Sequence, residues 1–231
     1  LNRDTGEAVA QGKVVFFDGG DRLLGDRIDY NLKTGTGVVY NGSASIAPCM
    51  TINTHVPLTS VLQIAPQRIV PVLTIKSLDH VDAIASAVIK SGIRNIEVTL
   101  RTDVSLEALR KFSAYSELIV GVGSVKNKDE LARAADAGAV FAVSPGYLHE
   151  IGKLARELDI YYLPGVATPT EIMRAYADGF DTLHFFPAEQ LGGIATLNAL
   201  SPVFPQVQFI PTGGINSKNA DDYLSKPFIA A

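Results

Sequence analysis

The sequence predicts an α/β fold: a (β/α)8 barrel of the TIM type, truncated at its eighth strand, with an antiparallel β-hairpin extension on its N-terminal side. Two observations predict the barrel. From Arg68 onward, short apolar stretches recur about every 22 residues, and stretches with the apolar spacing of an amphipathic helix lie between them. A single strand spacing with intervening helices is typical of a parallel barrel.

The predicted strands are short and apolar, and several of them end in Gly, Pro or polar turns. They cover residues 69–75, 95–100, 118–122, 140–143, 161–163, 182–185, 207–210 and 228–231. The amphipathic helices between them include residues 78–90, 105–115, 128–137 and 169–177. Because the last strand begins only at the end of the chain, we expect an incomplete barrel.

The first 44 residues contain β-strand patterns only. The predicted strands are Ala8–Phe17, Arg22–Tyr30 and Gly37–Tyr40, joined by glycine-containing turns. Residues 45–67 are rich in Ser, Thr and Pro, which is typical of a linker, and one helical turn is predicted near Thr59–Ile64. The chain therefore divides into a β-hairpin segment (1–44), a linker (45–67) and the barrel (68–231).

Composition excludes several classes of partner. The apolar fraction is 47%, the charged fraction is 19% and the net charge is -4, so no basic surface for nucleic acid is expected. No apolar run approaches the ~18 residues of a membrane-spanning helix. The single cysteine, Cys49, rules out an internal disulfide framework. The chain starts at Leu1 with neither Met nor the apolar core of a signal peptide, and we interpret this end as that of a fragment.

Polar residues on the strand at 95–100 are the first candidates for chemistry. The two-residue period of a strand places Glu97, Thr99 and Arg101 on one face. Glu97 is a candidate general acid/base, because burial would raise the pKa of its carboxyl group. The alternative is a structural ion pair between Glu97 and Arg101. Arg101 could instead bind a carboxylate or phosphate, or could be a surface cation at a strand end.

A histidine lies on the strand at 182–185, where Thr182, His184 and Phe186 share one face. His184 could act as an acid/base group near neutral pH or as a metal ligand. It could equally be a pocket histidine that does no chemistry.

Three strands end in turns rich in glycine: 121–124, 144–146 and 211–214. Backbone N–H groups at such turns can bind phosphate or carboxylate, and loops after late strands often do so in this fold.

These motifs together resemble a known family. Pro71-Val72 through Lys76, Glu97 to Thr102, Gly121 to Ser124, Ser144 to Gly146, Phe185 to Glu189 and Pro211 to Gly214 occur in the order and spacing of the 2-keto-3-deoxy-6-phosphogluconate / 4-hydroxy-2-oxoglutarate aldolase family. The resemblance runs from about Pro57 to Ala231. It implies a cytoplasmic class I aldolase on a trimeric barrel that needs no cofactor. It also implies cleavage of a small-molecule 2-keto acid phosphate to pyruvate and glyceraldehyde 3-phosphate.

The resemblance also implies roles for individual residues. Glu97 corresponds to the general acid/base; Arg101, Ser124 and Thr212 to substrate contacts; Pro145 and Phe186 to the pocket lining; Gly213 and Gly214 to the phosphate site. One position departs from the family. The Schiff-base lysine immediately precedes the Phe-Phe-Pro-Ala-Glu motif, and this chain has His184 there. An imidazole cannot form the imine that the reaction requires, so impaired activity is expected.

The residues also allow several alternative functions. Lys76 could replace the missing nucleophile, and a metal held by His184 and Glu97 would need a third ligand, for which His55, His80 and His149 are poorly placed. The barrel could also bind 2-keto acid phosphates without turnover. Residues 1–44 resemble the periplasmic β-jellyroll domain of lipopolysaccharide-transport proteins, so a fragment of a lipopolysaccharide-assembly protein fused to a barrel is a further possibility. That resemblance conflicts with a cytoplasmic aldolase.

Overall fold

The computed structural model describes residues 7–18, 21–31, 36–40, 43–45 and 68–231 of the chain. The chain forms two compact units, Leu1–Val56 and Pro57–Ala231. The helical turn predicted near Thr59–Ile64 lies outside the described residues.

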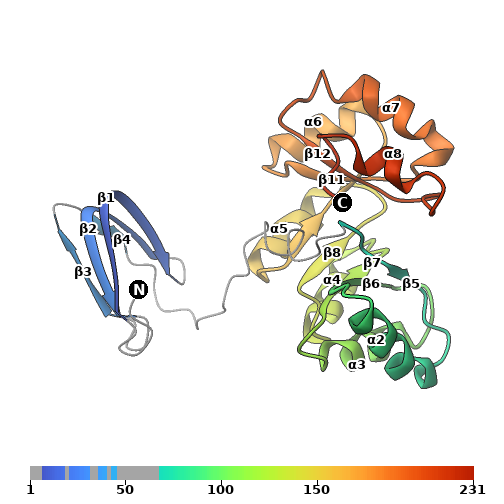
Figure 1. Cartoon of the computed structure of the whole chain (residues 1–231), viewed down its shortest axis with the longest axis horizontal. Coiled ribbons are helices and arrows are strands. Elements are labelled where there is room, and N and C mark those ends of the chain that lie inside the picture. Colours follow the sequence, from blue (N-terminus) through green and yellow to red (C-terminus); the bar gives the residue numbers. More distant parts are fainter. Residues whose placement is uncertain (1–6, 19–20, 32–35, 41–42, 46–67) are drawn as a thin grey trace. The chain divides into compact units, whose positions relative to one another are not determined.

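The N-terminal unit contains four antiparallel strands (Figure 1). They are β1 (Glu7–Asp18), β2 (Asp21–Asn31), β3 (Thr36–Tyr40) and β4 (Ser43–Ser45). β2 pairs with β1 along one edge, and β3 and β4 pair with different parts of its other edge. The predicted hairpins are therefore present. β4 was not predicted, because its Ser-Ala-Ser sequence has little β-propensity of its own.

The C-terminal unit is built on parallel strands that neighbour one another in sequence order. A five-stranded sheet contains β5 (Val72–Leu73), β6 (Asn95–Thr99), β7 (Ile119–Gly123), β8 (Phe141–Val143) and β9 (Tyr161–Leu163). A three-stranded sheet contains β10 (Gly165–Val166), β11 (Thr182–Phe185) and β12 (Gln208–Pro211). Pro164 separates β9 from β10, because proline has no N–H group to donate. Its carbonyl still accepts the His184 N–H at 2.9 Å, so the strand order continues across the break.

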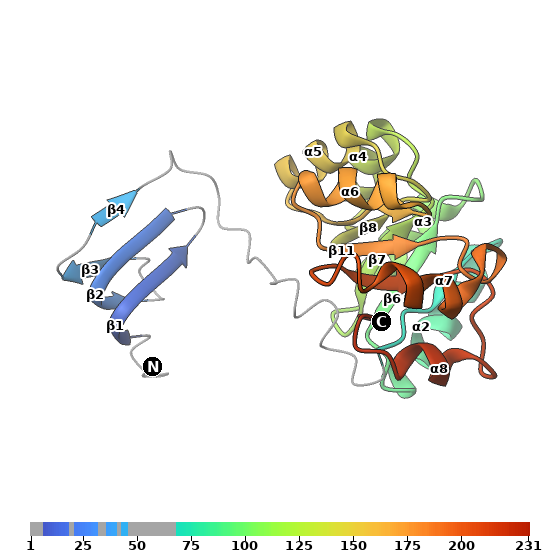
Figure 2. The same ribbon diagram turned by 90° about the horizontal axis from the view of Figure 1, so that it is seen from above.

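The helices lie on the outside of these strands, as Figures 1 and 2 show. They are η1 (Leu78–His80), α2 (Val81–Lys90), α3 (Ser105–Ser113), α4 (Lys128–Asp136), α5 (His149–Glu157), α6 (Pro169–Ala177), η2 (Glu189–Leu191), α7 (Gly193–Leu200) and α8 (Ala220–Leu224). α6 has the predicted bounds, and its start is fixed by a capping box in which Thr168 is the N-cap, Pro169 the first helical residue and Glu171 the third. The alternation of parallel strands and outer helices confirms the predicted α/β class.

Apolar side chains fill two regions of the barrel. Helix residues pack against the outer faces of the strands, with Leu109 and Ile172 fully buried among them. A smaller cluster fills part of the interior and consists of Phe141, Val143, Leu163 and Ile210. Because successive residues of a strand face opposite sides, the interior residues alternate with those under the helices.

The predicted eighth strand is reduced to one bridge in the structure. Phe209 pairs in parallel with Ile229, supported by the Phe209 N–H to Phe228 carbonyl bond of 2.8 Å and the Ala230 N–H to Phe209 carbonyl bond of 2.9 Å. The segment at the C-terminal end therefore runs beside β12, where the barrel order requires it (Figure 1). The first strand, predicted over 69–75, is likewise short, and only Val72 and Leu73 pair with β6.

Arg68 joins the start of the barrel to its last segment. Its guanidinium donates to the carbonyl groups of Leu224 and Ala230, both at 3.1 Å, and to that of Ile229. We expect Arg68→Ala to lower the free energy of unfolding by roughly 3 kcal/mol, because three carbonyl groups lose a charged donor. Urea unfolding of the full chain measures this change. Arg110→Ala is the matched control, since Arg110 forms only an exposed 3.4 Å pair with Glu107. Equal losses in the two variants would contradict the joining role of Arg68.

Candidate functional site

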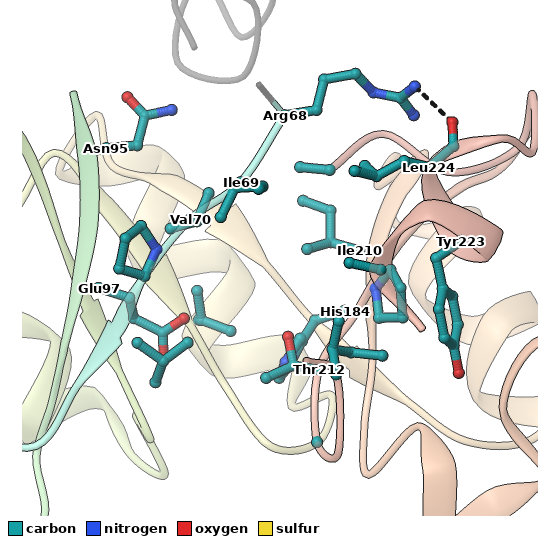
Figure 3. Close-up of a pocket in the computed structure, with 18 of the residues that line it drawn as sticks. Arg68, Ile69, Val70, Asn95, Glu97, His184, Ile210, Thr212, Tyr223 and Leu224 are labelled. Atoms are coloured by element: carbon teal, nitrogen blue, oxygen red, sulfur yellow. Dashed lines mark hydrogen bonds between the residues drawn. The ribbon is translucent and has the colours of Figure 1, made fainter. Parts of the chain in front are cut away.

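A cavity of about 610 Å³ lies within the barrel (Figure 3). Its lining includes residues 68–72, which lead into β5, inward-facing residues of β6, β8, β9, β11 and β12, and residues 213–217 after β12. Five of the residues predicted for the site line this cavity: Glu97, His184, Thr212, Gly213 and Gly214. Figure 3 shows Glu97 on one side and His184 and Thr212 on the other. The structure therefore brings together the predicted acid/base group, the nucleophile position and the glycine turn.

Glu97 carries a perturbed carboxyl group. All residues of β6 are buried, and Glu97 is only 7% exposed. Burial disfavours the charged form and raises the pKa of Glu97 to about 7, although the Arg101 cation acts in the opposite direction. Near neutral pH the side chain thus exists in both protonation states. A group of this kind can donate a proton to a ligand or accept one from it.

Space for the Glu97 carboxyl group depends on Gly123 of the neighbouring strand β7. A methyl group on Gly123 would lie 1.8 Å from Glu97 Oε1, so the carboxyl group would have to turn away. We expect Gly123→Ala to cost about 1–3 kcal/mol of stability and to shift the pKa of Glu97. Urea unfolding and a carbon-13 NMR titration of the Glu97 carboxyl group measure the two effects.

Gly146→Ala provides the matched control for this prediction, because a methyl group there would have no atom within 4 Å. It should change neither stability nor the titration of Glu97 appreciably. An unchanged Glu97 pKa in Gly123→Ala would show that Gly123 does not determine the position of the carboxyl group.

His184 is an uncharged, oriented imidazole. Its Nδ1–H donates to the Ser144 carbonyl oxygen at 3.0 Å, and its ring stacks on that of Phe186 with centroids 5.6 Å apart. The residue is only 6% exposed. Burial lowers the pKa of His184 to about 4, while the bond to Ser144 acts in the opposite direction. At neutral pH this position therefore provides neither a cation nor a primary amine.

Arg101 and Ser124 lie outside the cavity lining and bind each other. Arg101 Nε donates to Ser124 Oγ at 2.9 Å. Ser124 adopts a left-handed backbone conformation with φ of 63°, which orients its side chain at the end of β7. Arg101 is exposed, and among the described residues it forms no ion pair with Glu97. The structural Glu–Arg pair considered as an alternative is thus absent from this part of the chain.

Pro145 and Phe186 also lie outside the cavity lining. The side chain of Pro145 is exposed, and its backbone packs on Gly165, where an added methyl group would lie 2.3 Å from the Pro145 carbonyl carbon. Phe186 is half-buried and contacts the site through its stack on His184. The assignment of Pro145 to the pocket lining stays a prediction.

The turn after β12 is fixed by glycine conformations and by the segment after β11. Gly213 and Gly214 have φ of 103° and 84°, a region that favours glycine. Thr212 and Gly213 accept hydrogen bonds at 2.8 and 3.0 Å from the N–H groups of Ala188 and Glu189. These bonds hold the turn at the carboxyl ends of the strands, where barrel proteins place their binding sites.

Some contributors to the site could not be found by residue type. The Ser144 carbonyl that orients His184 belongs to the backbone, and every residue has such a group. The sequence predicts that Gly123 belongs to an anion-binding turn. In the structure, its lack of a side chain leaves space for the Glu97 carboxyl group. Tyr223 also lines the cavity, and its hydroxyl donates to Glu189 Oε1. Burial raises the pKa of Tyr223 above its usual range.

Two alternative chemistries depend on the positions of Lys76 and of the histidines. Lys76 is exposed and does not line the cavity. Across the described part of the chain, no group of three or more His, Cys, Asp or Glu side chains is placed to hold a metal ion. His149 begins α5 and lies 2.8 Å from an Asp178 oxygen, while His55 falls outside the described residues.

None of the helices in the described ranges has both the length and the apolar character needed to cross a membrane.

The fold and cavity define a class of protein: an α/β barrel with a small-molecule site inside its strands. The protein family described as "Aldolase: KDPG and KHG aldolase" matches residues 60–231. The chain belongs to this family, and the resemblance seen in the sequence is confirmed.

Individual relatives agree with this assignment. The KHG/KDPG aldolase of Escherichia coli K12 is 42% identical over 167 residues, covering 72% of this chain and 78% of that protein. The 2-dehydro-3-deoxy-phosphogluconate aldolase of Zymomonas mobilis is 40% identical over 172 residues, covering 74% and 82%.

Solved structures of the same family are also similar. The 2-keto-3-deoxy-6-phospho-gluconate aldolase of Zymomonas mobilis ATCC 29191 has a TM-score of 0.72 at 40% identity, covering 75% of this chain and 84% of that one. The KDPG aldolase of Legionella pneumophila, with pyruvate captured as a covalent carbinolamine, has a TM-score of 0.71 at 40% identity, covering 74% and 83%.

Proposed function

We propose that this barrel binds 2-keto acids of the aldolase family, 2-keto-3-deoxy-6-phosphogluconate or 4-hydroxy-2-oxoglutarate, and that His184 impairs their cleavage to pyruvate and an aldehyde. The observation that carries the proposal is the pair of groups facing the cavity. Glu97 has the raised pKa of a general acid/base, whereas the neighbouring position before Phe-Phe-Pro-Ala-Glu holds a neutral imidazole. Glu97 would thus supply the acid/base half of the chemistry, while residue 184 offers no amine.

The covalent step explains why an amine is needed. A primary amine adds to the C2 ketone and loses water, which leaves an iminium ion. When the C4 hydroxyl loses its proton, the C3–C4 bond breaks, the aldehyde departs, and the iminium nitrogen accepts the electron pair. Protonation at C3 and hydrolysis then release pyruvate and restore the amine. An imidazole nitrogen has no second hydrogen to lose, so it cannot form this imine.

The Legionella pneumophila relative was captured with pyruvate as a carbinolamine, the adduct that precedes water loss in this scheme. That observation supports the same covalent route for the family's reaction. In the present chain the route would stop before the carbinolamine, because the chain places His184 where the family's lysine would stand.

The remaining site assignments are part of the proposal. Glu97 would transfer protons at the substrate, Thr212 would contact the substrate, and Gly213 and Gly214 would bind its phosphate through backbone N–H groups. Phe186 would contact the substrate beside the His184 ring.

Arg101 and Ser124 would contribute to substrate binding as a hydrogen-bonded pair, although they lie outside the cavity lining. For Arg101 to take part, its exposed side chain would have to turn toward the mouth of the cavity. Its guanidinium could then bind a carboxylate or phosphate through two N–H groups.

The proposal extends to assembly, location and domain organisation. A homotrimer and a cytoplasmic location would follow from family membership. The family match covers residues 60–231 and therefore does not include the hairpin segment. We propose the division into a hairpin segment (1–44), a linker (45–67) and a barrel (68–231). The likeness of residues 1–44 to a periplasmic domain stays a prediction.

A binding barrel without turnover is the second candidate function, and the neutral His184 favours it. Turnover separates the two. Because the chain has no amine at residue 184, we expect His184→Lys to release pyruvate from 2-keto-3-deoxy-6-phosphogluconate at least roughly 100-fold faster than the unaltered chain. Release by the unaltered chain above the uncatalysed background would identify an impaired aldolase, and release at the background rate would identify a binding barrel. Glu97→Gln in the lysine variant should remove most of that gain. Efficient cleavage by the unaltered chain would overturn the proposal.

A further inference from the structure

The turn after β12 contains three successive peptide units whose carbonyl groups are all bound. The carbonyls of Thr212 and Gly213 accept backbone N–H groups from the segment after β11. The carbonyl of Gly214 is bound twice by side-chain amides, because Asn216 Nδ2 donates to it at 3.0 Å and Asn219 Nδ2 at 3.1 Å. The directions of all three carbonyl groups are therefore fixed.

The N–H groups of the same peptide units are available to a ligand. In a trans peptide unit, the carbonyl and the N–H of the next residue lie in one plane and point in opposite directions. The N–H groups of Gly213, Gly214 and Ile215 therefore point away from the partners of the three carbonyls. Within the described ranges, none of these three N–H groups has a hydrogen-bond acceptor. Gly214 is exposed, Gly213 and Ile215 are half-buried, and all three line the cavity, so a ligand can reach this turn.

The two asparagine side chains are themselves oriented by the loop. Asn219 Oδ1 accepts the Asn216 N–H at 2.8 Å, and Asn216 Oδ1 accepts the Lys218 N–H at 2.9 Å. An amide oxygen can only accept and an amide nitrogen can only donate. Because each oxygen is bound to an N–H group, each side chain presents its NH2 group to the Gly214 carbonyl.

We propose that Asn216 and Asn219 position a third phosphate donor in this turn. By holding the Gly214 carbonyl, they direct the Ile215 N–H toward the ligand, beside the N–H groups of the two glycines. Successive backbone N–H groups form a concave site for an anion. Without the two amides, the peptide unit between Gly214 and Ile215 can rotate and turn its carbonyl oxygen toward the phosphate, which repels it.

This inference rests on the proposed function, which places the phosphate of the bound acid at the turn. It adds one donor, the Ile215 N–H, and the two side chains that orient it. Asn216 and Asn219 are positioning residues, because they act on the phosphate through the backbone of the turn.

Two acids that differ only in the phosphate group test the inference: 2-keto-3-deoxy-6-phosphogluconate and 2-keto-3-deoxygluconate. Isothermal titration calorimetry of the full chain should show tighter binding of the phosphorylated acid. The double variant Asn216→Ala/Asn219→Ala should bind that acid at least roughly fivefold more weakly, as the loss of one hydrogen bond to a charged group allows. Its binding of the unphosphorylated acid should not change. Asn198→Ala is the matched control, because it makes the same substitution at an exposed residue of α7.

Nitrogen-15 NMR separates positioning from a purely structural role. In the unaltered chain, the amide proton of Ile215 should move downfield when the phosphorylated acid binds, and it should not do so with the unphosphorylated acid. In the double variant this response should be lost. Urea unfolding of the variant verifies that it is folded, and the Ile215 response of the unaltered chain tests the third donor without any substitution.

The outcomes separate this inference from the proposed function. Equal weakening of both acids in the double variant, a phosphate preference that the variant keeps in full, or an Ile215 amide that does not respond to the phosphorylated acid overturns the positioning role. Each of these results leaves the 2-keto acid site standing. If the unaltered chain binds neither acid at millimolar concentration, the proposed function falls, and this inference falls with it.

Discussion

Replacing Glu97 by glutamine is expected to stabilise the folded protein by about 3 kcal/mol more at pH 8 than at pH 4.5. The folded-state pKa of Glu97 is raised from 4.5 to about 7, so the folded protein holds a proton that the unfolded chain releases. The stability that this group contributes is present below pH 4.5 and is lost as the pH rises through about 7. Glutamine keeps the shape of the side chain and cannot ionise, so the variant does not lose this stability as the pH rises.

The free energy of unfolding, measured in urea at several pH values, shows the effect as a difference between parent and variant. Glu107→Gln is the matched control, because it makes the same substitution at an exposed helix residue. A pH-independent difference for Glu97→Gln would mean that the carboxyl group of Glu97 titrates normally in the folded protein.

Replacing His184 by glutamine is expected to give the opposite dependence on pH. The folded-state pKa of His184 is lowered from 6.5 to about 4, so the unfolded chain binds a proton that the folded protein does not. The corresponding stability is fully present above pH 6.5 and is lost as the pH falls through about 4. We expect His184→Gln to be more stabilising at pH 4.5 than at pH 7.5 by about 2–3 kcal/mol.

The two groups therefore oppose each other between about pH 4.5 and 6.5. There Glu97 lowers stability with rising pH and His184 raises it, each by about 1.4 kcal/mol per pH unit, so their contributions nearly cancel. Urea unfolding should show that Glu97→Gln gains stability with rising pH in this range relative to the parent, and that His184→Gln loses it. Two variants with slopes of the same sign would contradict the opposed protonation states of Glu97 and His184.

The repeated strand–helix units of the barrel were predictable from the sequence. Strand β11 and helix α6 have the predicted bounds, because strand alternation and the Thr168 capping box are local patterns. The break at Pro164 and the short length of β5 depend on hydrogen bonding between strands that are distant in sequence. Local sequence patterns do not determine that pairing. The closing contact of Arg68 with Ile229 and Ala230 joins the two ends of the barrel and has no sequence pattern of its own.

The candidate site was predictable in its residues but less so in its geometry. Alternation along the strands placed Glu97 and His184 inside the barrel, and both line the cavity. The same reasoning placed Arg101 there, but the residue lies beyond the end of β6, where its long side chain reaches Ser124 instead. The protonation states of Glu97 and His184 could be predicted only in part, because the burial of a carboxyl or imidazole group depends on residues that are distant in sequence.

Borohydride reduction in the presence of pyruvate tests the central claim most directly, because it asks whether an imine forms in the cavity. Mass spectrometry of the peptide that contains residue 184 should show no pyruvate adduct in the unaltered chain and a reduced adduct in His184→Lys. The surface lysines serve as internal controls, since any adduct on them should be equal in both proteins. Efficient trapping of pyruvate by the unaltered chain, at Lys76 or at any other single lysine, would contradict the claim that His184 removes the covalent step.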